Sequence, residues 1–197
     1  MRAIIRGTVL LAAALLLAPV AGRAATYEID AVHSTVGFRI RHLVGRVNGQ
    51  FTKFAGTIVF DAAQPTRARV NATIEAASIN TANERRDDHL RGADFFDVEK
   101  YPTLTFVSRK VTPKGKGRFQ IQGDLTMRGV KRPVVMNAVY NGSGQDQQGR
   151  RRIGFTATTR LNRKDYAISW NQTLDRGGAV LGDEVEITLE IEAVEQR

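Results

Sequence analysis

Three histidines, His33, His42 and His89, are the residues best suited to metal binding in this 197-residue chain. A three-histidine metal site would need all of their rings to converge. His33 and His42 have opposite parity along the chain, which places their side chains on different faces of a strand or in a turn. The sequence therefore predicts no metal site, and structural hydrogen bonding for the histidines.

Asp30, His33 and Ser34 together supply the residue types of a catalytic triad. Adjacent residues on a strand point to opposite faces, and no nucleophile elbow or oxyanion loop lies nearby in the sequence. The charged residues 86–88 are better explained as a polar network on a helix surface than as paired catalytic carboxylates. We therefore predict hydrogen bonding at a strand entrance here, no catalytic residue and no enzyme.

The elements that position these residues are strands, because apolar side chains recur at every second position. In residues 47–60 the apolar parity shifts near Thr52 and Lys53, which predicts a bulge there. The alternation predicts about eight strands, several of them about ten residues long. The segments are 35–41, 47–60, 69–76, 104–106, 119–125, 134–138, 153–161 and 185–191.

Eight antiparallel strands with one apolar face pack as a sandwich or close into a barrel, because an open sheet would expose its edges. We predict an all-β fold, an eight-stranded antiparallel barrel. One stretch has helical character: Thr81 and Glu84 have capping-box spacing, and a polar run stops at Gly92. This stretch predicts a short helical flap between strands 3 and 4, with Leu90 and the pair Phe95 and Phe96 turned inward.

The interior of such a barrel is either filled by side chains or wide enough for one small ligand. The alternation of Phe, Ile and Val alone favours a filled core. Small residues on the apolar parity, such as Gly49 and Gly123, leave space that the phenylalanines could fill. A membrane barrel is disfavoured because the last strand carries four Glu and the aromatics form no paired girdles.

The N-terminal residues have the three-part layout of a secretory signal peptide. Arg2 and Arg6 precede a stretch of mainly Leu and Ala from Val9 to Val20, and small residues follow. This apolar run is shorter than the roughly 20 residues of a membrane-spanning helix, which disfavours a retained anchor. We therefore predict a signal peptide at residues 1–24, cleaved near Ala24, and one barrel domain at residues 25–197.

Charge and cysteine content limit the partners. Removing residues 1–24 takes away three arginines and lowers the formal net charge from +9 to +6. The remaining basic residues are scattered among acidic ones, which predicts no nucleic-acid partner. A transient contact with a membrane surface stays open, and so does a homodimer. The chain has no cysteine, so it forms no disulfide and its stability must come from its core.

Eight segments resemble the YceI-like family in sequence and in order along the chain. The most specific part is residues 78–108, which includes Arg86-Asp87-Asp88-His89-Leu90-Arg91 and Asp94-Phe95-Phe96-Asp97. The segments are residues 27–38, 47–51, 54–56, 78–81, 86–91, 94–97, 101–106 and 123–130.

The resemblance implies an extended lipocalin-like barrel, periplasmic or secreted in bacteria, that binds polyisoprenoids or similar long-chain lipids in an elongated pocket. No cofactor is expected beyond such a lipid. We expect an exported carrier or binding protein for an isoprenoid quinone or polyprenyl lipid. The alternatives are a solid-core barrel with a stress or interaction role, and an isoprenoid-modifying enzyme.

The expected lipid contacts are inward aromatic and aliphatic side chains of the strands, with a second group at the mouth. The strand residues are Phe38, Ile40, Phe51, Leu104, Phe106, Phe119, Ile121, Leu125 and Phe155, and the mouth residues are Leu43, Leu90, Phe95 and Phe96.

Overall fold

The computed structural model describes residues 24–173 and 179–196. The predicted signal peptide therefore lies, up to residue 23, outside the described residues, and its cleavage stays a prediction. The strands are β1 (Ala25–Ile29), β2 (Thr35–His42), β3 (Gly45–Phe51), β4 (Phe54–Phe60), β5 (Arg69–Glu75), β6 (Ile79–Asn80), β7 (Thr103–Pro113), β8 (Arg118–Met127), β9 (Val130–Gln145), β10 (Arg151–Asn162) and β11 (Leu181–Glu195). The helices are α1 (Glu84–Arg91) and three 3-10 turns, η1 (Pro65–Arg67), η2 (Ala76–Ser78) and η3 (Arg163–Tyr166).

The strands close into a barrel because β1 pairs with both β4 and β11. The ring runs β1-β4-β5-β7-β8-β9-β10-β11 and returns to β1, with every neighbouring pair antiparallel. After β1 the strand is interrupted at residues 30–34, and β2 then pairs with β11 on one side and with β3 on the other. The predicted eight-stranded antiparallel barrel is confirmed, with β1 and β2 as two parts of its first strand and β3 and β4 as two parts of its second.

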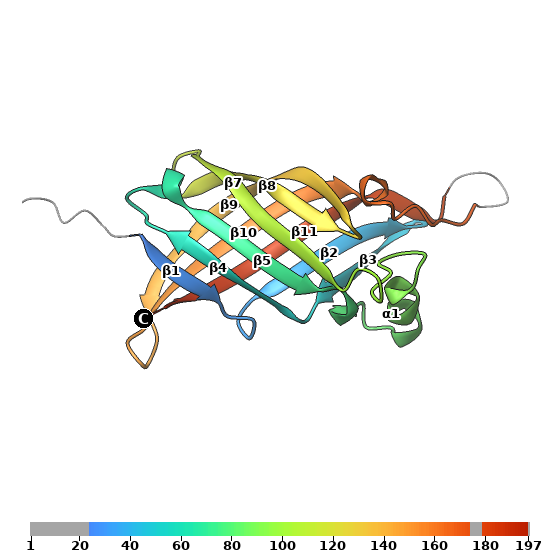
Figure 1. Ribbon diagram of the computed structural model, residues 1–197, viewed down its shortest axis with the longest axis horizontal. Coiled ribbons are helices and arrows are strands. Elements are labelled where there is room, and N and C mark those ends of the chain that lie inside the picture. Colours follow the sequence, from blue (N-terminus) through green and yellow to red (C-terminus); the bar gives the residue numbers. More distant parts are fainter. Residues whose placement is uncertain (1–23, 174–178, 197) are drawn as a thin grey trace, which may run out of the picture.

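The barrel is elongated, and its two ends differ (Figure 1). One end carries α1 and the β2–β3 turn, and we call it the helix end. The other carries the start of β1 and the C-terminal end of β11, and we call it the terminal end. The predicted helical flap is confirmed: α1 lies between the third strand, β5 with its extension β6, and the fourth strand, β7.

The parity shift near Thr52 and Lys53 is a two-residue break between β3 and β4 and not a bulge within one strand. The backbone of these residues pairs with the segment around η2. The Thr52 N–H donates to the Ser78 carbonyl at 3.1 Å, and the Lys53 carbonyl accepts from the Glu75 N–H at 2.9 Å. The break therefore has its own hydrogen bonds, which a sequence pattern does not reveal.

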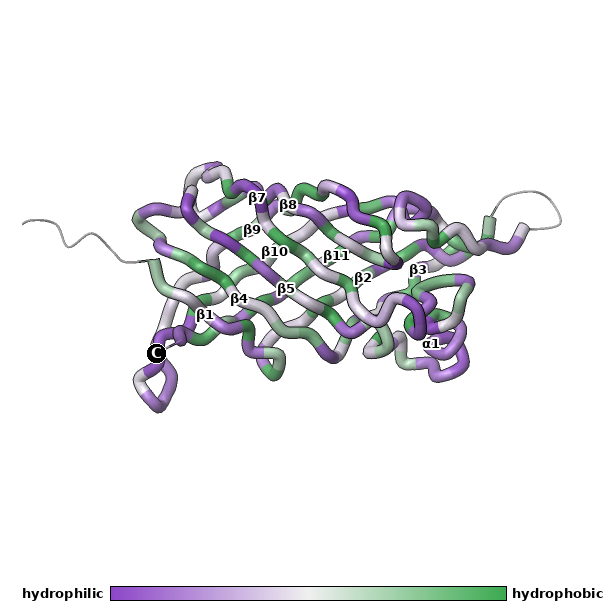
Figure 2. The backbone as a smooth tube through the Cα atoms, viewed as in Figure 1, coloured by the Kyte–Doolittle hydropathy of each residue, from purple (hydrophilic) through white to green (hydrophobic). Residues whose placement is uncertain are grey.

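Hydrophobic and hydrophilic residues alternate along the strands (Figure 2). On β11, Val185, Ile187 and Leu189 face the interior, while Glu184 and Glu190 are exposed. This alternation gives each strand one apolar face to bury. No helix within residues 24–173 and 179–196 is long and apolar enough to cross a membrane.

The start of α1 differs from the predicted capping box. The N-cap is Asn83, whose side chain accepts from the Arg86 N–H at 3.0 Å. Thr81 is separated from the helix by Ala82 in the left-handed region, with φ 61°, and its hydroxyl donates to Asp87 instead. The predicted end of the helix at Gly92 is confirmed.

Candidate functional site

A cavity of about 420 Å³ runs along the inside of the barrel. Its lining includes residues of the terminal end, such as Phe60 and Phe119, and residues of the helix end, such as Leu90 and Trp170. The volume lies in the range of ordinary small-molecule sites. The barrel interior is therefore not filled by side chains, contrary to what the alternation alone favours.

Of the thirteen residues expected to contact a lipid, twelve line this cavity. Leu43 does not: it lies in the two-residue turn between β2 and β3 and is 41% exposed. The alternation that places Phe38 and Ile40 inside ends at this turn. The twelve are Phe38, Ile40, Phe51, Leu90, Phe95, Phe96, Leu104, Phe106, Phe119, Ile121, Leu125 and Phe155. Their contact with a lipid stays a prediction.

Glycines on the inner parity accommodate aromatic rings. A Cβ at Gly49 would lie 2.3 Å from the ring of Phe38, and a Cβ at Gly123 would lie 2.4 Å from the ring of Phe106. Both rings therefore fit against the wall only because these two positions lack a side chain. The space that these two glycines leave is filled by phenylalanine and is not part of the cavity.

An aromatic cluster closes the cavity at the terminal end. Phe60, which is 5% exposed, packs against Tyr140 and Phe155 with ring centroids 5.1 Å apart in each case. Phe119 contacts Phe60 edge-on at 6.1 Å. These rings form a packed wall in which edge-to-face contacts are favourable.

The cavity reaches solvent at the helix end. Among its lining residues that the structure describes, four are exposed: His42, Arg86, His89 and Gln172. All four are polar, whereas the rest of the lining is mainly apolar. Sequence reasoning missed these residues as a group because they come from β2, α1 and the segment after η3, which only the folded barrel brings together.

Two of these polar residues, Arg86 and His89, are positioned by contacts with neighbouring side chains around α1. The Arg86 Nε donates to the Thr81 hydroxyl at 2.7 Å. The His89 Nε2 lies 3.0 Å from the Asp94 carboxylate, and its ring packs edge-on against Trp170 at 4.9 Å. The mouth thus presents a guanidinium, an imidazole and an indole ring that these contacts position.

A buried arginine supports the same end. Arg163, which is 3% exposed, donates to the carbonyls of Ile168 at 2.9 Å, Trp170 at 2.7 Å and Gly182 at 2.9 Å. Burial lowers the pKa of its guanidinium, and Asp183 opposes this effect. Because its N–H groups donate to these backbone carbonyls, Arg163 orders the rim of the mouth.

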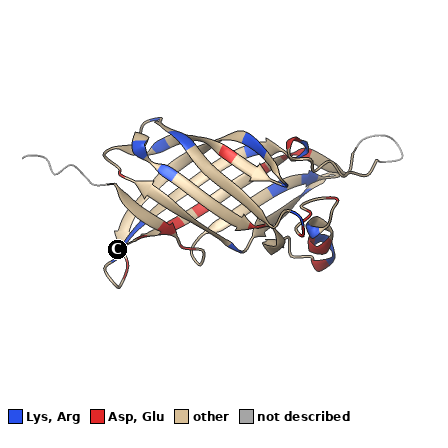
Figure 3. Cartoon of the chain, in the orientation of Figure 1, with Lys and Arg blue, Asp and Glu red and all other residues tan. Residues whose placement is uncertain are grey.

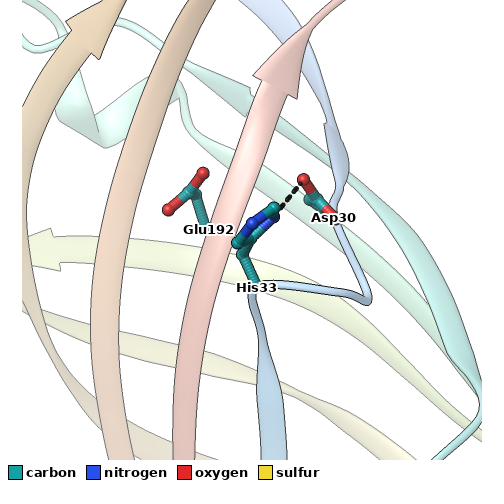
Figure 4. A group of neighbouring side chains, drawn as sticks. All are labelled: Asp30, His33 and Glu192. Atoms are coloured by element: carbon teal, nitrogen blue, oxygen red, sulfur yellow. Dashed lines mark hydrogen bonds and ion pairs between the residues drawn. The ribbon is translucent and has the colours of Figure 1, made fainter. Parts of the chain in front are cut away.

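The three residues considered as a catalytic triad lie on the outside of the terminal half of the barrel. The His33 Nδ1 lies 2.8 Å from Asp30 Oδ2 (Figure 4). The Ser34 hydroxyl, however, donates to the Glu192 carbonyl at 3.1 Å and accepts from the Glu192 N–H at 3.0 Å. Ser34 is thus hydrogen-bonded to the backbone of β11 and not to His33.

The same region contains the one group of three potential metal ligands found among the described residues, Asp30, His33 and Glu192. The guanidinium of Arg152 bridges the two carboxylates, at 2.7 Å from Asp30 and in contact with Glu192. These hydrogen bonds lower the pKa of Asp30 and raise the pKa of Arg152. The carboxylates of Asp30 and Glu192 are thus already paired with the Arg152 cation, and the group forms an ion network that fastens the β1–β2 connection to β10 and β11.

The fold and the site define an antiparallel β-barrel with an elongated apolar cavity, closed at one end and polar at its mouth. The sequence profile of the YceI-like domain matches residues 27–193, and the chain belongs to the YceI-like family.

A relative of similar length agrees with this assignment, and two solved structures share the fold. A UPF0312 protein of Shewanella baltica is 41% identical over 182 residues, which cover 91% of this chain and 92% of the relative. The crystal structure of Burkholderia cenocepacia BcnA has the same fold, with a TM-score of 0.75 at 24% identity over 83% of this chain and 98% of that one. A polyisoprenoid binding domain from Saccharophagus degradans has a TM-score of 0.62 at 14% identity, over 88% and 100% of the two chains.

Proposed function

We propose that this protein is an exported carrier or binding protein that holds one long-chain apolar lipid, of the isoprenoid quinone or polyprenyl type, inside its barrel. The observation that carries the proposal is the cavity, which runs between the two ends of the barrel and opens among polar residues at one of them. The similarity to a domain described as polyisoprenoid binding supports the choice of lipid.

The physical basis of binding is the transfer of an apolar chain from water to an apolar wall. Each Å² of apolar surface removed from water contributes about 25 cal/mol. A compact polar metabolite would gain little from this lining and would leave its own polar groups unpaired. The geometry therefore favours a hydrocarbon chain over a sugar, nucleotide or amino acid.

The cavity gives the lipid a direction. The apolar tail would extend toward the aromatic cluster around Phe60, and the polar head would lie among His42, Arg86, His89 and Gln172. The exposed position of these four residues keeps a head group hydrated while the tail is buried. The proposed lipid thus has one polar end and one long unbranched or isoprenoid chain.

Binding without catalysis is part of this proposal. Ser34 is hydrogen-bonded to the backbone of β11, and His33 pairs with Asp30 on the outer surface.

The export that we propose rests on the signal-like N-terminal sequence and fits a carrier that acts in the periplasm or outside the cell.

Extraction of the purified, unheated protein with organic solvent, followed by mass spectrometry, tests the proposal. We expect about one isoprenoid or other long-chain lipid per chain. Repeated absence of lipid, together with failure of the emptied protein to take up an isoprenoid quinone or polyprenol, would refute it. That result would favour a barrel with a stress or interaction role.

A further inference from the structure

The turn between β2 and β3 exposes two consecutive apolar side chains, and we call Leu43 and Val44 the apolar tip. Val44 is fully exposed, at 106%, and Leu43 is 41% exposed. Leu43 also has a positive φ of 51°, and a two-residue hairpin normally takes Gly, Asn or Asp where φ is positive. The geometry of the turn therefore does not explain why these two positions carry apolar side chains.

The apolar tip lies at the mouth of the cavity. His42, the residue before it, is one of the exposed cavity-lining residues. The Leu43 N–H donates at 2.8 Å to the carbonyl of Val180, which also lines the cavity. A surface that contacts the apolar tip would therefore face the opening through which a lipid must pass.

Positive charge surrounds the apolar tip. Glu186 is the single carboxylate shared by Arg39 and Arg46, at 2.5 Å and 2.8 Å. Arg41 has no carboxylate within 4.0 Å in the described part of the chain, and its guanidinium donates to the Leu43 carbonyl at 3.1 Å. The basic residues of β2 are arginines, and basic positions are seen on the strands near the helix end (Figure 3). This end of β2 and β3 thus has a local excess of positive charge.

We propose that the apolar tip and the surrounding arginines dock the barrel, mouth first, on the surface of an anionic lipid bilayer. Two apolar side chains inserting between head groups, with cations at head-group level, are the combination that holds proteins at membrane interfaces. Docking would let a lipid move between bilayer and cavity without crossing water. The proposal rests on the proposed lipid-binding function and adds the surface where lipid is loaded or released.

Co-sedimentation with vesicles tests the docking. The described residues form a closed barrel with its own core, so the chain from Ala25 onward is used, without the apolar N-terminal stretch that would bind lipid itself. We expect binding to phosphatidylcholine vesicles that contain phosphatidylglycerol, weaker binding to phosphatidylcholine alone, and loss of the difference at high salt. Absence of binding to the anionic vesicles would overturn the proposal.

The double variant Leu43→Ser/Val44→Ser should bind the anionic vesicles at least about tenfold more weakly than wild type, because both apolar side chains are removed. The matched control is Val135→Ser/Val139→Ser, which removes two exposed valines of β9 that are 45% and 42% exposed and do not line the cavity. Equal vesicle binding by wild type and the apolar-tip variant would overturn the proposal. So would an equal loss in both double variants.

Lipid content distinguishes failure of the docking from failure of the proposed function. The apolar-tip variant should retain its co-purified lipid, because neither residue lines the cavity, and should transfer lipid to vesicles more slowly. A wild type that binds vesicles through the apolar tip but never contains lipid would leave the docking intact and refute the carrier function.

Discussion

Asp87 on α1 accepts two hydrogen bonds from Thr81, one from the backbone N–H at 2.9 Å and one from the hydroxyl at 2.5 Å. Both residues are buried, at 5% and 7% exposed. Arg86 donates to the hydroxyl and the carbonyl of the same threonine. The helix at the mouth is therefore held by a buried polar contact to Thr81, the residue that follows β6, and the same residue holds Arg86 at the cavity.

Replacement Asp87→Ala should lower the free energy of unfolding by about 2–3 kcal/mol, because it leaves two buried donors of Thr81 unpaired. Urea unfolding measures the change. The control Asp88→Ala removes a neighbouring carboxylate whose side chain is 68% exposed, and should change stability by about 0.5 kcal/mol or less. Equal effects of the two variants would show that the Asp87 contact is not important.

Replacement Ile187→Trp should reduce the lipid that co-purifies with the protein by about tenfold, because the larger ring occupies the cavity that Ile187 lines. Overpacking should cost about 1–3 kcal/mol of stability. The matched control is Thr188→Trp, one residue along β11, where the side chain is exposed on the outer face. Mass spectrometry of solvent extracts measures both, and equal lipid content would contradict the cavity as the binding site.

Replacement Phe60→Ala should remove the centre of the aromatic cluster and cost about 3–5 kcal/mol of stability. The space it leaves adjoins the cavity at the terminal end, so the variant should accept longer chains than wild type. Competition among polyprenols of increasing length measures this shift. An unchanged length preference in a folded variant would show that the cluster does not set the end of the cavity.

Stability should fall as the solution is acidified below about pH 4, in part through Asp30. The hydrogen bonds from Arg152 and His33 hold the pKa of Asp30 well below its ordinary value of 3.8. A carboxyl with a lowered folded-state pKa stabilises the protein above its ordinary pKa, and this stabilisation is lost as the pH falls toward the lowered value. The thermal midpoint should therefore decrease through this range.

The variant Asp30→Asn should show a shallower decrease over the same range and a lower midpoint at neutral pH. Glu28→Gln is a fitting control, because Glu28 is exposed and forms no ion pair among the described residues. If Asp30→Asn kept the full acid dependence, the ion network with Arg152 would not contribute to stability.

The sequence predicts the barrel wall well because inward and outward positions alternate regularly, as Phe38 and Ile40 illustrate. It fails at Leu43, where the turn ends the alternation. It also does not show whether Gly49 and Gly123 leave empty space or receive a ring, because that depends on the neighbouring strand.

The polar mouth is the part of the site that sequence alone does not reveal. Arg86 and His89 lie within the helix that the sequence predicts, but Gln172 and the buried Arg163 lie in the connection between β10 and β11, which the sequence does not predict in detail. Their proximity results from closure of the ring and from the hydrogen bonds of Arg163 to backbone carbonyls. The Arg163 contacts span only five and seven residues, but they fall in an irregular segment. The approach of this segment to β2 and α1 spans a large part of the chain and has no local pattern in the sequence.

The closed terminal end has a kinetic consequence. A chain that enters tail first must leave head first through the same opening, so a second lipid cannot enter until the first has departed. In the proposed carrier, exchange would therefore pass through an empty barrel, and its rate in solution should become independent of the concentration of the incoming lipid. The protein would then work as a single-occupancy shuttle and never as a conduit.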